Sequence, residues 1–416
     1  MRIYQLLFEY PPYIRGGISR YGADLVQNLN KYNYEIHVFA IGNATKTNIT
    51  PRFPGKIYVH WLNVDDTENR LDHNRYYNKL VIEKAIQLSK EMKEPDLIHI
   101  HSWLSSIAGI KLQKLFGVPL FFHVHSTILG KISALVKYFN LLIKRKNLRD
   151  AFKFVTTIEK RTFNNADKII VPTKYMKDEC IKLYGNISST KVIIIPNGVN
   201  INKFCPRTLN KNIRAWKIGK DNSSHLILYV GRIVPEKGLN ILIDAIPLIS
   251  KEVPNIKVII AGKAPKTLMS SEDYLNFLKR KIIKHNINNK VVFAGFIRDE
   301  ILPYIYNISD LVVNSSFYEP VGLSILEAMA SGKPVVATEA SGIRDYIRQY
   351  KAGIIVKIGD IEQLSEAIIK LLLDRDMRFK MGVNGRKCVE EHFNWQKIAK
   401  DIVNLYDEFL CLKTYH

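Results

Sequence analysis

Two glutamates on either side of a strand-to-helix turn have the types and spacing that best suit chemistry in this chain. Glu319 lies in a loop after a strand-like run that ends at Val313, and Glu327 lies in the helical pattern that begins at Gly322. A helix start leaves backbone N–H groups without intrahelical partners and carries a partial positive charge, so it attracts phosphate. Two carboxylates beside such a site suit a ligand with hydroxyl groups next to a diphosphate. The alternative is an ordinary strand–turn–helix unit with a surface glutamate on each side.

Two cations suit the same kind of ligand. Arg232 and Lys237 follow the strand-like run His225 to Val230 in the stretch Gly-Arg-Ile-Val-Pro-Glu-Lys-Gly. At the carboxyl end of a strand they would face a cleft between domains, where fixed cations bind a diphosphate. Ordinary surface charge is the alternative for either residue alone. An Asp-x-Asp metal motif is missing from the strand ends, and we single out no residue as a covalent nucleophile, so the sequence predicts chemistry without a metal.

These residues need a scaffold of alternating strands and helices. A mostly parallel sheet covered on both faces is predicted twice along the chain, once in each half. The first half has strand-like runs at 34–41, 57–62, 96–101, 119–124, 168–171 and 192–195, and the second half at 225–230, 257–261, 291–294, 311–313, 334–337 and 354–356. Ligands of such sheets gather at the carboxyl ends of the strands. In the first half His99, His101, His123 and His125 fall near such ends, although histidines there are often structural.

A further strand-like run at 2–9 leads into a turn with adjacent glycines, Gly16 and Gly17, next to Arg15. Adjacent glycines let a backbone approach a ligand closely, and Arg15 adds charge. The pattern is not GxGxxG, so dinucleotide binding is not indicated. A tight turn without a ligand is the alternative.

Length and composition indicate a two-domain globular protein. The chain has 416 residues, too many for a single hydrophobic core. Its 47% hydrophobic and 24% charged residues are ordinary for a globular protein. A polar, irregular stretch near 200–224 marks the boundary, so we expect domains at 1–200 and 201–393 and a C-terminal helix at 394–416 that returns to the first domain. The four cysteines lack metal-ligand spacing, and neither a signal peptide nor a membrane span is seen. These features predict a cytoplasmic protein.

The formal net charge is +22. Nucleic acid, an anionic membrane and anionic substrates are the partner classes that such a charge suits. The lysines are spread along the chain and no nucleic-acid module is seen, so we expect no nucleic-acid partner and interpret the charge as compositional bias. The basic, apolar stretch 131–149 fits either a solvated helix or an amphipathic helix at a membrane surface.

Several of these stretches together resemble retaining glycosyltransferase family 4, over nearly the whole chain. The resemblance lies in the paired glutamates of 319–327, in 231–238, in Pro-Asn-Gly-Val at 196–199 and in the early glycine pair. Within that family, the His-Ile-His-Ser-Trp and His-Ser-Thr stretches at 99–103 and 125–127 are most similar to the archaeal-type glycogen and starch synthase branch. The resemblance implies the GT-B fold: an α/β protein with two Rossmann-like, doubly wound parallel-sheet domains facing a central cleft, and a C-terminal helix packed on the first domain.

The resemblance also implies a role for each matching residue. Arg232 and Lys237 would hold the donor diphosphate, Glu327 the ribose hydroxyls, and Glu319 the donor sugar. The backbone amides of Gly322, Leu323 and Ser324 would contact sugar or phosphate. Gly16, Gly17 and Arg15 would belong to the first-domain loop over the donor, and His125 would lie beside the sugar. The residues expected to be catalytic are His125, Glu319, Arg232 and Lys237.

The implied reaction is a metal-independent, retaining transfer of a hexosyl group, favoured as glucosyl, from a nucleotide-diphosphate sugar such as UDP- or ADP-glucose to a hydroxyl. The donor is a substrate, and no cofactor is expected. An α-glucan is the favoured acceptor, and the alternative is a lipid-linked or cell-surface glycan reached through a peripheral membrane contact of 131–149. Departures from the family pattern, which leave the acceptor and the sugar open, fall at Arg15, Ser102, Ile128, Lys131, Asn200 and Ser341.

Overall fold

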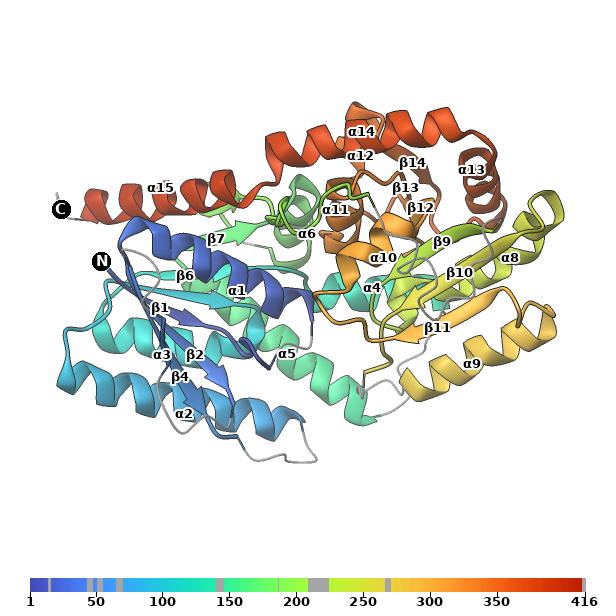
Figure 1. Ribbon diagram of the computed structural model, residues 1–416. Helices are drawn as coiled ribbons and strands as arrows, with labels where there is room; N and C mark the ends of the chain where they lie inside the picture. The colour runs from blue at the N-terminus through green and yellow to red at the C-terminus, as the bar shows by residue number, and fades with distance from the viewer. Residues whose placement is uncertain are drawn as a thin grey trace. The chain divides into compact units, whose positions relative to one another are not determined.

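A computed structural model gives the fold of two compact units, which are described here one at a time (Figure 1). The first unit comprises Met1–Gly130, Ile143–Gly198 and Trp395–His416, and the second comprises Lys131–Leu142 and Val199–Asn394. The structure describes residues 1–13, 16–42, 48–50, 55–64, 70–139, 146–185, 187–208, 224–265 and 271–413.

The first unit is built on an eight-stranded sheet in the order β3-β4-β2-β1-β5-β6-β7-β8. All neighbouring strands pair in parallel except the short β3, which is antiparallel to β4. The strands are β1 (Arg2–Leu6), β2 (Glu35–Ile41), β3 (Asn48–Thr50), β4 (Lys56–Leu62), β5 (Leu97–His101), β6 (Leu120–His123), β7 (Lys168–Val171) and β8 (Val192–Ile194). Their Val- and Ile-rich runs are buried on both faces, as expected for parallel strands.

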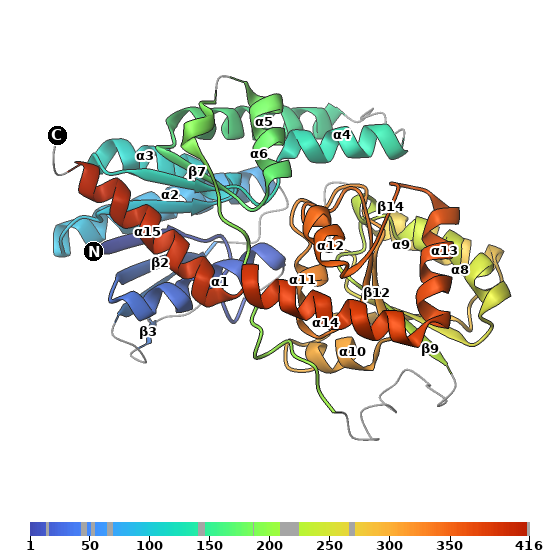
Figure 2. The ribbon, with the colours of Figure 1, turned by 90° about the horizontal axis from the view of Figure 1, so that it is seen from above.

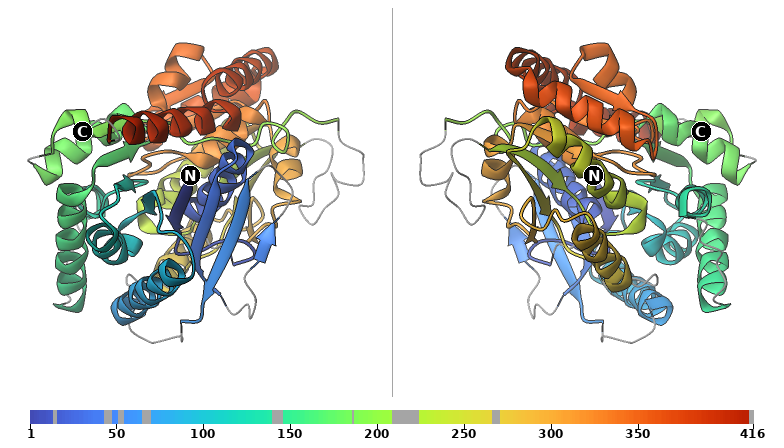
Figure 3. Two further views of the ribbon diagram at one scale, coloured as in Figure 1. Left: turned by 90° about the vertical axis from the view of Figure 1, so that its left-hand side faces the viewer. Right: turned by 90° about the vertical axis from the view of Figure 1, so that its right-hand side faces the viewer.

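Helices cover both faces of this sheet. One face packs against α2 (Arg70–Glu91), α3 (Ser106–Phe116), α5 (Lys146–Asn165) and α6 (Lys174–Tyr184), and Figure 3 shows α2 in light blue beside the blue strands. The other face packs against α1 (Gly17–Leu29) and the C-terminal helix α15 (Trp395–Lys413), which lie together in Figure 2. The last helix therefore completes the core of the first unit, as the sequence predicted.

The second unit has a six-stranded sheet in the order β11-β10-β9-β12-β13-β14, with parallel pairing throughout. Its strands are β9 (His225–Val230), β10 (Ile256–Ala261), β11 (Val291–Gly295), β12 (Leu311–Asn314), β13 (Val335–Thr338) and β14 (Gly353–Val356). One face carries α10 (Leu302–Ile308), α11 (Leu323–Ala330), α12 (Arg344–Tyr350) and α14 (Arg375–His392), and the other carries α8 (Leu239–Glu252), α9 (Ser271–Lys284) and α13 (Ile361–Leu373). The strand order runs outward in opposite directions from the adjacent strands β9 and β12. The carboxyl ends of these two strands therefore lie at a topological switch point.

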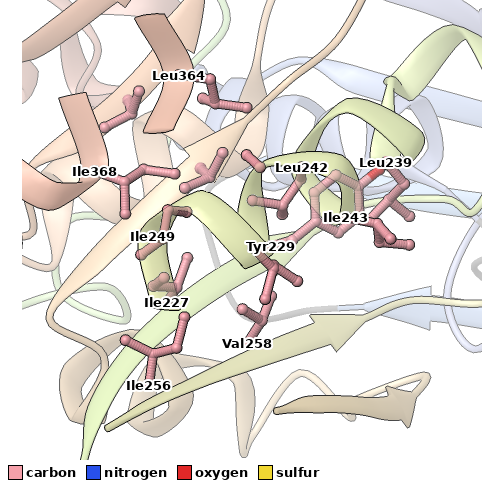
Figure 4. Close-up of a cluster of buried hydrophobic side chains, with 14 of the residues drawn as sticks. Ile227, Tyr229, Leu239, Leu242, Ile243, Ile249, Ile256, Val258, Leu364 and Ile368 are labelled. Atoms are coloured by element: carbon pink, nitrogen blue, oxygen red, sulfur yellow. The ribbon is translucent and has the colours of Figure 1, made fainter. Parts of the chain in front are cut away.

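Figure 4 shows part of the core under α8 and α13. Ile227 from β9, Leu242 from α8 and Ile368 from α13 are fully buried there. Each such side chain contributes roughly 1.5–3 kcal/mol by leaving water. This rigid layer fixes the end of β9, from which the candidate site begins.

Two sequence expectations need correction in detail. The basic stretch 131–149 was expected to be a single helix, either solvated or amphipathic at a membrane surface, but it is divided between α4 (Ile128–Phe139) and α5, which begins at Lys146. The residues between these two helices lie outside the described part of the chain. The antiparallel strand β3 was not expected, because its three residues carry too little pattern to distinguish them from a loop. Within the described residues, every helix is too short or too polar to cross a membrane.

Candidate active site

The loop between β12 and α11 is held in place by its neighbours in the second unit. The backbone N–H groups of Phe317 and Tyr318 both donate to the carbonyl of Glu236, at 2.9 and 3.3 Å. The Thr338 hydroxyl, at the end of β13, donates to the Ser316 carbonyl at 2.6 Å. The loop is buried, and its backbone groups are bonded by the turn that follows β9 and by the end of β13, which holds the loop in place.

A glycine allows the two halves of this site to meet. Gly238 lies between the 3₁₀ turn η4 (Pro235–Lys237) and α8, and its φ of +63° is in the left-handed region. A Cβ atom at this position would lie 1.9 Å from the carbonyl oxygen of Ser315. Only glycine combines that conformation with that close approach. The Lys237 side chain therefore enters the site next to the loop that carries Glu319.

Lys237 and Glu319 form the central contact of the site. The Lys237 ammonium lies 2.6 Å from Oε2 of Glu319. The same oxygen accepts hydrogen bonds from the Asn314 side-chain amide at 2.9 Å and from the Ser316 hydroxyl at 3.3 Å. Among the described residues, no hydrogen bond or ion pair involves Oε1 of this carboxylate. The second carboxylate oxygen thus remains available to a ligand.

The Glu319 carboxylate is ionised although it is buried. Only 8% of the residue is exposed. Burial alone would raise the pKa of this carboxyl, but the Lys237 charge and the bonds from Lys237, Asn314 and Ser316 outweigh it and hold the pKa below the ordinary value. A cation and an anion are therefore fixed side by side at the carboxyl ends of β9 and β12.

The start of α11 supplies a second group of polar contacts. Gly322 caps the helix with a φ of +79°, and the backbone amides of Leu323 and Ser324 form its first turn. One turn further on, Glu327 is buried and accepts a hydrogen bond from the Tyr306 hydroxyl at 2.7 Å. The helix end and the Glu327 carboxylate thus have the placement that the sequence predicted within this unit.

Arg232 lies in a different environment from Lys237. Its side chain is 47% exposed and approaches Oε1 of Glu236 to 3.6 Å. Glu236 is buried and also pairs with Lys131, a residue of the second unit, at 2.7 Å. Burial alone would raise the pKa of Glu236, but the Lys131 and Arg232 charges together outweigh burial, so the pKa is below its ordinary value. Two cations therefore lie close to one buried carboxylate.

The candidate residues of the first unit do not all lie in the described part of the chain. Arg15 falls outside it. Gly17 begins α1, and Gly16 caps it with an extended backbone and open space where a side chain would stand. His125 follows β6 and is 5% exposed.

His125 belongs to a cluster of four buried histidines, with His99, His101 and His123. Their rings lie nearly parallel, with centroids of neighbours 4.4 to 5.7 Å apart. Burial lowers the pKa of His125 and of His99 to about 3, and burial followed by the neighbouring histidines lowers the pKa of His101 and His123 as well. All four imidazoles are therefore neutral near pH 7.

Three of these histidines have the composition of a metal site. Nitrogen atoms of His99, His101 and His123 all lie within 4.8 Å of one another. One nitrogen of His101 is already bonded to Gln5 at 2.9 Å, and one of His99 is bonded to Tyr406 at 2.5 Å. Three imidazoles suit zinc or copper, so metal independence remains a prediction for this chain.

Sequence reasoning did not find all the residues that build the site. Asn314, Ser316 and Tyr306 bond the two candidate glutamates, yet such residue types are common in any loop or helix. Asn314 had the one usable signal, since it stands at the end of a buried strand, where polar side chains of α/β sheets gather around ligands. Glu236 was noted only as part of a motif.

Comparisons with known proteins agree with this architecture. The family model "Glycosyltransferase Family 4" matches residues 15–203, and the model "Glycosyl transferases group 1" matches residues 210–388. Together the two matched ranges take in most of the chain.

Three relatives align along nearly their full length. An uncharacterized glycosyltransferase of Methanocaldococcus jannaschii is 28% identical, with 98% of both chains covered. An alpha-maltose-1-phosphate synthase of Mycolicibacterium smegmatis is 25% identical over 98% of this chain and 99% of its own. A glycogen synthase of Mycobacterium tuberculosis is 24% identical over 98% of this chain and 94% of its own.

Solved structures share the fold. A sucrose-phosphate synthase from Thermosynechococcus elongatus superimposes with a TM-score of 0.80 at 24% identity, covering 99% of each chain. The Anabaena protein HepE in complex with UDP-glucose gives a TM-score of 0.74 at 20% identity, covering 98% of this chain and 100% of its own. The two matched models and the two parallel-sheet units identify the chain as a glycosyltransferase of the family 4 type with the GT-B fold.

Proposed function

We propose that the protein is a retaining, metal-independent hexosyltransferase that moves a glucosyl group from UDP- or ADP-glucose to a hydroxyl of an α-glucan. The Lys237–Glu319 ion pair at 2.6 Å, beside the start of α11, is the observation that carries this proposal. HepE binds UDP-glucose, and a glycogen synthase is among the relatives, which supports the choice of donor and acceptor.

The proposed mechanism places charge stabilisation in the second unit. Negative charge develops on the leaving diphosphate as the sugar–phosphate bond breaks. Lys237, Arg232 and the first-turn amides of α11 would stabilise that charge, an effect that usually dominates catalysis. The acceptor hydroxyl would attack from the same face and give its proton to the leaving phosphate, so configuration is retained without a covalent intermediate on the protein.

Other residues would hold the donor. Glu319 would orient Lys237 through Oε2 and contact the sugar through Oε1. Glu327, buried and fixed by Tyr306, would accept from the ribose hydroxyls. In the first unit, His125, Gly16, Gly17 and Arg15 would contribute on the sugar side.

The second candidate acceptor is a lipid-linked or cell-surface glycan at a membrane. Lys137, in the stretch 131–149, is exposed and could contact anionic lipid. Lys131 already pairs with the buried Glu236, which removes one cation from the surface that would meet the lipid.

A donor and acceptor screen with purified protein and EDTA tests the proposal. We expect release of nucleoside diphosphate from UDP- or ADP-glucose, stimulated by glycogen. Turnover only with UDP-GlcNAc or GDP-mannose would change the donor, and turnover that needs anionic vesicles and vanishes in high salt would favour the membrane acceptor. Turnover that appears only after a divalent metal is restored would contradict the metal-independent mechanism.

A further inference from the structure

Gln5 lies at the centre of the histidine cluster in the first unit. It is fully buried on β1, and its neighbours come from β5 and from α15. Its side-chain amide donates to the Tyr406 hydroxyl at 3.2 Å. Its carbonyl oxygen Oε1 lies 2.9 Å from Nε2 of His101. Both ends of the buried amide are thus bonded, with the oxygen toward His101 and the nitrogen toward Tyr406.

That orientation determines where His101 carries its proton. With the amide oxygen of Gln5 facing His101, this oxygen accepts a hydrogen bond from Nε2 of His101, which is then the protonated nitrogen. Because the ring is buried and neutral, its Nδ1 then has a free lone pair. Nδ1 of His101 lies 3.4 Å from Nε2 of His125. The lone pair therefore faces His125 and favours a proton on Nε2 of that residue.

The other nitrogen of His125 is then the unprotonated one. Nδ1 of His125 is buried and has no hydrogen-bond partner among the described residues. His125 is also the most exposed of the four histidines, at 5% against 0–2% for the others. A buried acceptor without a partner is unusual in a folded protein, and a hydroxyl group is the kind of ligand that would satisfy it.

We propose that Gln5 is a positioning residue that sets the tautomer of His125 through His101, so that Nδ1 of His125 accepts a hydrogen bond from a hydroxyl of the donor sugar. This inference rests on the proposed function, since it takes His125 to lie beside the sugar. Tyr406 supports the relay from the C-terminal helix: it accepts from Gln5 and donates its own proton to Nδ1 of His99 at 2.5 Å.

The groups around the relay are consistent with a neutral chain of hydrogen bonds. The side chains packed on it are His99 and His123 from β5 and β6, Tyr21 from α1, and Trp395 and Tyr406 from α15. None of these carries a carboxylate. The tautomers are therefore set by the Gln5 amide rather than by a nearby charge.

Nitrogen NMR on the full-length protein labelled with ¹⁵N-histidine tests the first half of the inference without any substrate. We expect His125 and His101 to be neutral and protonated at Nε2. A His125 protonated at Nδ1 would overturn the inference. So would stoichiometric zinc or copper bound to the purified protein, because the metal would then set the tautomers. This measurement gives its answer even if no donor is ever turned over, so failure of the inference and failure of the proposed function are distinguishable.

Kinetics of Gln5→Met test the second half. Methionine keeps the length of the side chain but removes the acceptor, so we expect kcat to fall about tenfold, the effect of one lost hydrogen bond, with the KM for the nucleotide sugar little changed. Tyr34→Phe is the matched control, because it removes a hydroxyl bonded to Asp407 of α15 at 3.0 Å outside the relay. We expect this control to keep wild-type kcat.

Donors that lack single hydroxyls sharpen the test. In the wild type, one deoxy donor should lose more rate than the others, and in Gln5→Met that difference should disappear. Gln5→Glu, which keeps an oxygen facing His101, should restore much of the preference. Equal kcat and equal deoxy-donor preference in wild type and Gln5→Met would overturn the inference.

Discussion

Each of the two units has buried polar groups at the carboxyl ends of parallel strands. The two units differ in how the free-energy cost of burying these groups is avoided. In the first unit the four clustered histidines are neutral, because burial lowers their pKa. In the second unit Glu319 keeps its charge, because Lys237 lies 2.6 Å away. A polar site can thus be buried either by losing its charges or by pairing them.

Under the proposed function, this difference would divide the chemistry between the two units. A fixed ion pair beside a helix start suits a ligand of high charge, such as a diphosphate. A neutral, hydrogen-bonded cluster suits the hydroxyl groups of a sugar. The division of roles that the family resemblance implies is consistent with this difference and stays a prediction.

Removing the charge of the second unit should have the largest effect. We expect Lys237→Ala to lower turnover by about 10²–10³-fold or more, since a fixed cation at developing charge has that effect. Glu319→Ala should be similarly inactive. Lys237 is also the cation that compensates the buried Glu319 carboxylate. Its loss should therefore also lower the free energy of unfolding.

Turnover assays and urea unfolding on the same variants measure both effects. Lys279→Ala, on the exposed face of α9, is the matched control and should behave as wild type. Near-wild-type turnover in Lys237→Ala would remove the site assignment.

Acid should weaken the first unit before the second. The unfolded state binds protons at histidines below about pH 6.5 whereas the folded state does not, so stability is present above that pH and is lost as the pH falls. Each clustered histidine costs about 1.4 kcal/mol per pH unit. For Glu319 and Glu236, whose pKa values are lowered, the loss begins only below about pH 4.5.

One carboxyl of the first unit opposes this trend. Burial raises the pKa of Glu159 to about 7, so its contribution is present at low pH and is lost as the pH rises from about 4.5 to 7. One such group does not outweigh four histidines. Hydrogen exchange at pH 7.5 and pH 5.5 should show faster opening of the first unit alone at the lower pH. An equal response in both units would break the comparison.

Gly238→Ala should damage the second site through geometry alone. The new Cβ would lie 1.9 Å from the Ser315 carbonyl oxygen at a φ of +63°. We expect a loss of about 2–4 kcal/mol in unfolding free energy and a clear loss of turnover. Gly295→Ala separates strain from collision, because its φ is +69° but nothing lies within 4 Å of its added Cβ. Calorimetry that gives equal losses for both variants would contradict the steric argument.

Tyr306→Phe should have the smallest effect. It removes one hydrogen bond to Glu327, at 2.7 Å. We expect the KM for the nucleotide sugar to rise less than tenfold and kcat to stay near wild type, because Glu327 would bind the ribose equally in the ground and transition states. A fall in kcat without a change in KM would place Glu327 at the reacting centre instead.

Much of the fold could be predicted from the sequence because long, Val- and Ile-rich runs alternate with helical patterns. β7 and β9 have the predicted bounds, and most other strands agree within a residue or two. The site was less predictable. Glu319 and Lys237 stand out by motif, but their partner Asn314 is a common residue type, and its role depends on a strand end meeting a loop.

The relay in the first unit shows the same limit more strongly. Gln5 and Tyr406 are 401 residues apart in the chain. No local pattern links the first strand to the last helix, and only the folded sheet brings them to His99 and His101. Contacts of that kind follow from tertiary packing rather than from spacing.

The most direct test of the account is the anomeric configuration of the product formed in EDTA. Proton NMR would follow the transfer of glucose from UDP- or ADP-glucose to a glucan primer by the purified wild-type protein. The proposed retaining, metal-independent mechanism predicts an α-linked product from the α-configured donor without added metal. A β-linked product, or transfer that requires a divalent metal, would contradict it.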